Sequence, residues 1–221
     1  MFTWLSRSPH MPQLHAATGA PAEDPRPALA DASETSGWML RKACADDRER
    51  LMRLYDRLSP QTIYYRLFLP APHGPEWAAR FAALTLRETP LRQPAHRVAS
   101  GATSGGAFVV LTHDQSEIIG TAQYALSDEE PASSSAMPEV AAELALVVED
   151  AWQGRGVGTQ LMRALLRASR ADGYRAVSCH VLAENFRAQR FMTSRLAGVT
   201  AHFQDGGYAY RAPLDAQGAS D

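Results

Sequence analysis

The spacing of apolar side chains predicts that the chain folds from about residue 37 onward, beginning with a strand and a helix. Residues 38–43 form a short, mostly apolar run that we interpret as a strand. Asp46 and Asp47 then provide helix-start signals. After them, apolar residues recur at spacings of three and four, as on one face of an amphipathic helix: Leu51, Leu54, Tyr55 and Leu58.

Two further helices are expected next. Ser59 and Pro60 interrupt the first helix and start a second, with Ser59 as the N-cap and Pro60 at the first helical position. The second helix covers residues 61–68 and stops before Pro70, and a third helical segment fits residues 76–86.

The middle of the chain has the character of β-strands. Residues 107–111 and 118–124 are apolar runs on either side of a polar turn at 112–117, which is typical of an antiparallel hairpin. Residues 127–138 are rich in serine, proline and acidic residues, so we expect a mobile loop there. The next strand is predicted at 140–148.

The last third alternates between helix and strand. A long helix starts at Gly156, has one apolar face, and ends at Gly173. That face consists of Val157, Leu161, Leu165 and Ala168. A strand at 176–181, a helix at 185–196 and two closing strands at 199–203 and 208–212 complete the predicted elements.

The two ends of the chain lack this periodicity. Residues 1–36 contain five prolines among alanine, serine and acidic residues, which predicts a disordered Pro/Ala-rich tail. We therefore expect one folded domain at 37–215, followed by a flexible C-terminus at 216–221.

Composition narrows the class of protein. Of the 221 residues, 45% are hydrophobic and 21% are charged, as in soluble globular proteins. No run approaches the roughly 20 apolar residues of a membrane-spanning helix, and a net charge of -2 provides no basic field for nucleic acid. Cys44 and Cys179 form no disulfide framework. We expect a cytoplasmic protein that binds neither membranes nor nucleic acid.

Residues 153–158, Gln-Gly-Arg-Gly-Val-Gly, connect a strand to the long helix and are a candidate phosphate loop. The start of a helix offers several amide donors and the positive end of its dipole, and glycines leave those amides accessible. The spacing fits neither GxxxxGK[ST], because lysine is missing, nor the dinucleotide pattern GxGxxG. An ordinary strand-to-helix turn is the alternative.

The same residues resemble the acetyl-CoA motif of the GNAT superfamily, Q/R-x-x-G-x-G/A, and residues 143–148, 177–181 and 185–188 resemble the segments that flank it. The resemblance implies an α/β (α+β) fold with a mixed, mostly antiparallel sheet, flanking helices and two splayed central parallel strands around the pantetheine. It also implies the residues that bind acetyl-CoA. These are Leu146, Val147 and Val148 along the pantetheine, Gln153, Gly154, Arg155, Gly156, Val157 and Gly158 at the diphosphate, and Asn185 at the far end.

Two passages resemble the catalytic domain of bacterial protein lysine acetyltransferases more specifically. Residues 58–68, LSPQTIYYRLF, resemble their LSPES…RFF helix, and residues 142–156 resemble their AEFAVVV.D.WQGRG segment. The resemblance implies that a primary amine, a protein lysine in particular, is the acceptor, and that residues 59–66 form one wall of its cleft. Tyr64 and Tyr65 are candidates to contact the lysine stem, with packing inside the helix as the alternative.

Amide formation requires a neutral amine, yet a lysine amine with a pKa near 10.4 is about 99.9% protonated at pH 7. A carboxylate beside the cofactor accepts such a proton directly or through a water. Glu143 stands in an otherwise apolar strand, and the resemblance implies that it is the general base. A solvent-facing glutamate at the open end of the strand is the alternative.

No acid for the departing CoA thiolate is assigned. Many members of the superfamily have a tyrosine seven residues after the asparagine that matches Asn185, where this chain has Met192. Water or one of four other tyrosines remains available, namely Tyr64, Tyr65, Tyr208 or Tyr210.

Other catalytic chemistry has less support. Cys179 and His180 are neighbours on a predicted strand and therefore point to opposite faces, which argues against a Cys/His nucleophile. The histidines and cysteines show no metal-ligand spacing, so no metal is predicted.

Three functions remain open from the sequence. They are a protein lysine acetyltransferase, an acetyltransferase for a small amine, and a non-catalytic regulator that binds acyl-CoA. The first two share every cofactor residue and differ only on the acceptor side.

Overall fold

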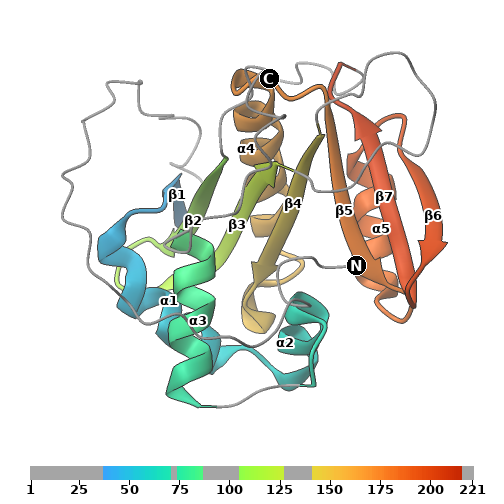
Figure 1. Cartoon of the computed structure of the whole chain (residues 1–221). Coiled ribbons are helices and arrows are strands. Elements are labelled where there is room, and N and C mark those ends of the chain that lie inside the picture. Colours follow the sequence, from blue (N-terminus) through green and yellow to red (C-terminus); the bar gives the residue numbers. More distant parts are fainter. Residues whose placement is uncertain (1–36, 71–73, 87–104, 127–140, 216–221) are drawn as a thin grey trace, which may run out of the picture.

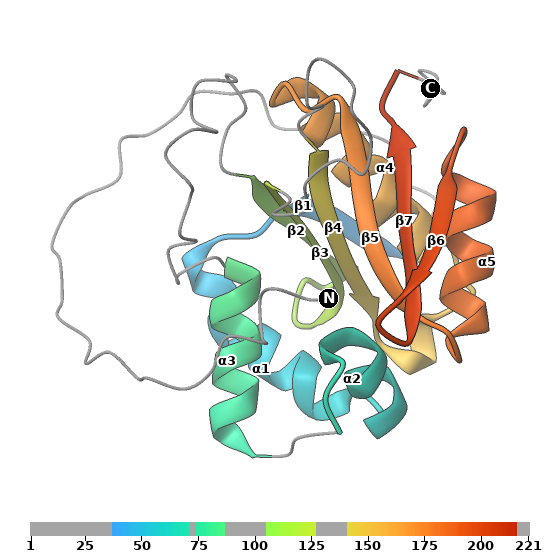
Figure 2. The same ribbon diagram turned by 45° about the vertical axis from the view of Figure 1, so that its right-hand side comes forward.

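A single mixed sheet organises the part of the chain that the computed structural model describes, residues 37–70, 74–86, 105–126 and 141–215. The order of its strands is β1-β2-β3-β4-β5-β7-β6 (Figures 1 and 2). All neighbouring strands are antiparallel except β4 and β5, which are parallel. The strands are β1 (Trp38–Lys42), β2 (Gly106–Thr112), β3 (Ile118–Leu126), β4 (Ala141–Val148), β5 (Ala176–Leu182), β6 (Thr200–Gln204) and β7 (Gly207–Pro213).

Helices cover both faces of this sheet. They are α1 (Arg48–Arg57), α2 (Pro60–Leu67), α3 (Pro75–Leu86), α4 (Val157–Ala171) and α5 (Phe186–Arg195), with short 3₁₀ turns η1 (Ala45–Asp47) and η3 (Asp150–Trp152). Helices α1 and α3 lie on one face, and α4 and α5 lie on the other (Figures 1 and 2). The predicted mixed, mostly antiparallel sheet with flanking helices is confirmed.

Each face has its own hydrophobic core. On one face, apolar residues of α1, α2 and α3 pack against β2, β3 and Val147 of β4. On the other, the predicted apolar face of α4 packs against the sheet, with Val157, Leu161 and Leu165 fully buried and Ala168 partly buried at its edge. The alternation of side chains along β4 therefore sends its odd-numbered and even-numbered residues into different layers.

The two parallel strands separate soon after they meet. Between β4 and β5, pairing is restricted to Ala141↔Ala176, Ala142↔Val177 and Glu143↔Ser178. Beyond Glu143, β4 remains paired with β3 as far as Val148, whereas β5 continues with β7. The splay that the sequence resemblance implied is present, and it leaves one edge of Leu144–Val148 facing an opening in the sheet.

Some predictions fall outside the described residues. These are the tail at 1–36, the loop at 127–138 and the C-terminus at 216–221, so the domain boundaries stay predictions. Within the described part of the chain, no helix combines the length and the apolar character needed to cross a membrane.

Candidate functional site

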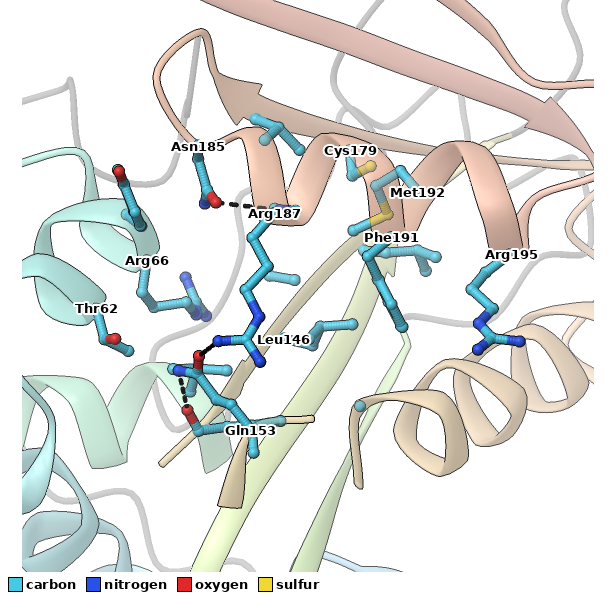
Figure 3. A pocket seen from close by; sticks show the side chains of 18 of the residues that line it. Thr62, Arg66, Leu146, Gln153, Cys179, Asn185, Arg187, Phe191, Met192 and Arg195 are labelled. Carbon is cyan, nitrogen blue, oxygen red and sulfur yellow. Dashed lines mark hydrogen bonds between the residues drawn. The ribbon is translucent and has the colours of Figure 1, made fainter. Parts of the chain in front are cut away.

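A cavity of about 680 Å³ lies where β4 and β5 diverge. Five elements provide its walls: the second half of β4, the middle of β5, the loop and first turn of α4, one side of α5, and α2 (Figure 3). It therefore joins the loop at 153–158 to the helix that the sequence assigned to the acceptor side.

The glycines of the loop are needed for different reasons. Gly154 and Gly156 have φ angles of 78° and 94°, in the left-handed region, and Gly156 is the N-cap of α4. Gly158 has an ordinary φ, and a Cβ there would come no closer than 3.7 Å to another heavy atom. The fold therefore does not require glycine at Gly158, whereas a ligand that approaches the backbone would.

The loop suits an anionic ligand. The first amides of α4 have no acceptor within the helix and lie at the positive end of its dipole. Gln153, Gly154, Gly156 and Gly158 all line the cavity. The sequence predicted that this loop binds the diphosphate of acetyl-CoA, and its donors and open glycines fit that group.

Arg187 and Gln153 form a hydrogen-bonded bridge between α5 and the loop (Figure 3). Arg187 Nη1 donates to Gln153 Oε1 at 2.6 Å, and Gln153 Nε2 donates to the carbonyl oxygen of Val148 at 3.0 Å. The bridge holds an exposed guanidinium beside the phosphate loop. The sequence offered three arginines that could neutralise the phosphates of CoA or be ordinary surface residues, Arg155, Arg187 and Arg190, and of these Arg187 alone lines the cavity.

Two loop residues point elsewhere. The guanidinium of Arg155 lies 5.2 Å from the centre of the Trp152 ring, and the side chain of Val157 is fully buried in the core beneath α4. Neither residue lines the cavity. Their contribution to a bound cofactor would therefore come through the backbone.

The second half of β4 fits an extended ligand. Leu146, Val147 and Val148 line the cavity and pair with β3 on their other edge, at Ala122, Thr121 and Gly120 respectively. On the side that faces the opening, their pairing with β5 has already ended. Their peptide groups there are available to amides such as those of pantetheine.

Asn185 serves as the N-cap of α5. Its side-chain Oδ1 accepts a hydrogen bond from the backbone N–H of Ala188 at 3.1 Å, and the residue lines the cavity. It therefore positions the start of α5 beside the cavity, at the position that the sequence assigned to the far end of the cofactor.

Helix α2 is fixed to the β4 side of the cavity through Asp150. The predicted N-cap is confirmed, because Ser59 Oγ accepts from the N–H of Thr62 at 3.2 Å. The Asp150 carboxylate accepts from the Ser59 N–H, the Ser59 hydroxyl and the Thr62 hydroxyl at 2.9, 2.8 and 2.7 Å. Partial burial would raise the pKa of Asp150, but these hydrogen bonds outweigh it and the pKa is lowered.

The two tyrosines fix α2 to the other side. Tyr64 Oη donates to Glu184 Oε1 at 2.9 Å, and Tyr65 Oη donates to the Glu184 carbonyl oxygen at 3.3 Å. The hydrogen bond to Glu184 is the main reason that the pKa of Tyr64 is raised. Tyr65 lines the cavity and Tyr64 does not. Helix α2 therefore spans the splay from Asp150 to Glu184.

Glu143 lies where the splay begins. It shares its face of β4 with Ala145 and Val147, and Val147 packs into the core beneath α1, α2 and α3. The partly buried Glu143 carboxylate therefore belongs to the α2 side of the sheet, next to the cavity rather than in its lining.

Arg66 lines the cavity opposite this strand and interacts electrostatically with Glu143. Burial lowers the pKa of Arg66 to about 10, and the charge of Glu143 opposes that decrease. The sequence resemblance placed Arg66 at the end of the cleft wall formed by residues 59–66 but gave its side chain no role. Its position four residues after Thr62, on the same face of α2, was the available signal.

The candidates for a general acid are reduced by the geometry. Of Tyr64, Tyr65, Tyr208 and Tyr210, Tyr65 alone lines the cavity. Met192, which occupies the position of the family's tyrosine, lines the cavity as well but has no proton to donate. Tyr65 is therefore the tyrosine best placed among the described residues.

Cys179 and His180 lie on opposite faces of β5. Cys179 packs into the core with α4 and α5, whereas the His180 ring lies 5.5 Å from the Phe68 ring at the end of α2. The predicted separation of the pair is confirmed. Among the described residues, no group of three His, Cys, Asp or Glu side chains could hold a metal ion.

Comparisons with known proteins agree with this geometry. The model of the acetyltransferase (GNAT) family matches residues 64–197. The GNAT domain of S. lividans PAT is 27% identical, with a TM-score of 0.54 over 79% of this chain and 89% of that chain.

Two solved structures with a bound cofactor share the fold. YncA from Salmonella typhimurium, solved with acetyl-CoA, is 16% identical, with a TM-score of 0.52 over 84% of this chain and 99% of that chain. Spermidine N-acetyltransferase from Vibrio cholerae, in complex with CoA and spermine, is 14% identical, with a TM-score of 0.55 over 82% and 98%. The chain belongs to the GNAT family of acyltransferases, whose members carry out acetyl-CoA-dependent N-acetylation.

Proposed function

We propose that this protein is a cytoplasmic enzyme that transfers the acetyl group of acetyl-CoA to lysine ε-amines of other proteins, with Glu143 as the general base. Membership of the GNAT family covers the cofactor and the type of reaction. The acceptor and the base are the parts that we add.

The position of helix α2 is the observation that supports a protein lysine as the acceptor. It spans the opening between Asp150 and Glu184, and four of its residues line the cavity. These are Gln61, Thr62, Tyr65 and Arg66. The same segment resembles the LSPES…RFF helix of bacterial protein lysine acetyltransferases, and the similarity to the GNAT domain of S. lividans PAT extends over 79% of the chain.

The position of Glu143 supports its role as the base. Acetyl-CoA supplies the thioester, and β4 provides the edge along which its pantetheine fits. Glu143 lies at the point where this edge begins, on the face of the sheet that α2 covers. An amine that enters between α2 and β4 therefore meets a carboxylate, which accepts the proton that the amine loses as the amide forms.

The departing thiolate needs less assistance. A thiol has a pKa near 8.5, so its anion is a tolerable leaving group. Tyr65 lines the cavity, but its hydroxyl donates to Glu184 in this structure. We propose that water protonates the thiolate, with Tyr65 as the alternative donor.

A thiol-release assay with a panel of acceptors tests this function. Acetyl-CoA is offered with an acyl-CoA synthetase, with spermidine and with an aminoglycoside, and acetylated lysines are located by mass spectrometry. We expect CoA release and lysine acetylation with the protein acceptor, and slow release with the small amines. Faster turnover of a small amine would contradict the protein acceptor. Tight binding of acetyl-CoA without release to any acceptor would contradict catalysis.

A further inference from the structure

Arg66 brings a partly buried positive charge into the acceptor side of the cavity. Its side chain extends from the last turn of α2 toward the middle of the cavity (Figure 3). Its Nε is buried and has no hydrogen-bond partner among the described residues. A desolvated cation with an unsatisfied donor is unfavourable until an anion approaches it.

The guanidinium keeps its charge at neutral pH. Burial lowers the pKa of Arg66 to about 10, while the carboxylate of Glu143 acts in the opposite direction. A pKa three units above pH 7 leaves about 99.9% of the side chains charged. Glu143 acts on Arg66 electrostatically, and Nε of Arg66 has no hydrogen-bond partner among the described residues, so this donor is not taken up by that carboxylate.

Arg66 lies toward the acceptor end of the cavity rather than the diphosphate end. Asp150, three residues before Gln153, binds the first turn of α2 through Ser59 and Thr62. Arg66 lies about one helical turn beyond Thr62. It interacts instead with Glu143, which is at the start of the splay.

We propose that Arg66 binds a carboxylate of the acceptor, so that the preferred acceptors carry an acidic group close to the amine that is acetylated. The inference rests on the acetyl transfer to an amine in the proposed function and specifies the chemistry of the acceptor. A guanidinium suits this task because its planar donors match the two oxygens of a carboxylate. The carboxylate comes either from an acidic residue beside a lysine in a protein or from the α-carboxylate of a free amino acid. By the same charge, Arg66 disfavours polyamines.

Matched pairs of acceptors test the carboxylate directly. One pair is a peptide with Asp or Asn next to its lysine, and the other is Nα-acetyl-lysine or its amide. In one of the two pairs, we expect kcat/KM to be about tenfold or more higher for the acceptor that carries the carboxylate. The pair that shows this difference identifies the source of the carboxylate. If only whole proteins are acetylated, the Asp/Asn pair is built beside the acetylated lysine of the acyl-CoA synthetase.

Three variants assign the preference to Arg66. Arg66→Gln should abolish the preference, so that kcat/KM becomes equal within each pair, mainly because KM of the carboxylate-bearing acceptor rises; comparison within a pair cancels any effect of the lost charge on Glu143. Arg66→Lys should keep part of the preference for the carboxylate, because lysine retains the positive charge but lacks the planar donors of a guanidinium. Arg163→Gln removes an exposed arginine of α4 and should keep all of it.

The outcomes separate this inference from the proposed function. Acetylation at equal rates within every pair would overturn the carboxylate site and leave the acetyltransferase intact. A preference that persists in Arg66→Gln would also overturn the role of Arg66. No acetylation of any acceptor would remove the proposed function and this inference together.

Discussion

Arg187 Nη1 and Gln153 Oε1 lie 2.6 Å apart and join α5 to the phosphate loop across one end of the cavity. Gln153 in turn donates to the carbonyl oxygen of Val148, so the contact continues to the end of β4. The residues that frame the predicted diphosphate site are thus connected before a ligand binds, which reduces the entropy lost on binding.

Arg187→Ala should weaken acetyl-CoA binding. The variant removes both the bridge and a cation beside the loop, and because Arg187 is exposed we expect an increase of about fivefold in Kd at low salt. Isothermal titration calorimetry at two salt concentrations measures the Kd for acetyl-CoA. The Kd of the variant should depend less on salt than the Kd of the native protein. Arg190→Ala, an exposed arginine of α5 outside the cavity lining, is the control. Equal effects of the two variants would contradict a specific role for Arg187.

Gly158→Ala should separate folding from cofactor binding. Its Cβ would find ordinary contacts at 3.7 Å and beyond, and alanine favours a helix over glycine by up to about 1 kcal/mol. The melting temperature should therefore be unchanged or slightly higher than that of the native protein. The methyl group would occupy space beside the first amides of α4, so we expect Kd for acetyl-CoA to rise at least about tenfold.

Gly207→Ala is the contrasting control for that variant. A Cβ at Gly207 would lie 2.5 Å from both the Val181 carbonyl oxygen and His180 Nε2, which forces β7 away from β5. We expect a loss of about 1–3 kcal/mol of stability, as for other overpacked sites. If Gly158→Ala lowered the melting temperature as much as Gly207→Ala, the cofactor-based reason for glycine at Gly158 would be wrong.

Asp150→Asn should loosen α2 and do so in a pH-dependent way. The pKa of Asp150 is lowered in the folded protein, so its ionised form stabilises the fold above its ordinary value of 3.8. That contribution disappears as the pH falls through the lowered pKa. We expect a melting temperature about 2–4 °C below that of the native protein between pH 5 and 8, the shift for about 1 kcal/mol.

Melting curves of both proteins between pH 3 and 8 measure this difference. It should begin to shrink below pH 3.8, where the carboxyl group of the unfolded chain becomes protonated, and should disappear below the lowered pKa of the folded protein. Asp56→Asn, an exposed aspartate of α1 outside the cavity lining, is the matched control. A difference that grows as the pH falls would contradict the assigned sign.

Local sequence patterns predicted most elements because their causes are local. The apolar face of α4 follows from helical periodicity, and the Ser59 cap reaches only to Thr62. The order of the strands could not be obtained in this way, since it depends on pairing between distant segments. The splay after Glu143↔Ser178 was expected from the resemblance to the GNAT superfamily. It could not be predicted from the periodicity of either strand.

The side chains of the site were harder to predict than its backbone. The glycine pattern located the loop, but the directions of Arg155 and Val157 depend on contacts with Trp152 and the core. Arg66 was expected in the cleft wall, but the direction of its side chain was missed because it depends on how α2 is held. The hydrogen bonds that hold it, from Ser59 to Asp150 and from Tyr64 to Glu184, join residues 91 and 120 positions apart.

Glu143→Gln tests most directly whether this cavity catalyses acetyl transfer with Glu143 as its base. CoA release with the best acceptor and the Kd for acetyl-CoA are measured on the variant, on the native protein, and on Glu76→Gln, an exposed glutamate of α3. We predict that turnover falls about 10²-fold or more in Glu143→Gln alone, while the Kd is unchanged, because the amide cannot accept the proton of the amine. Turnover equal to that of the native protein would contradict the assignment of Glu143 as the base.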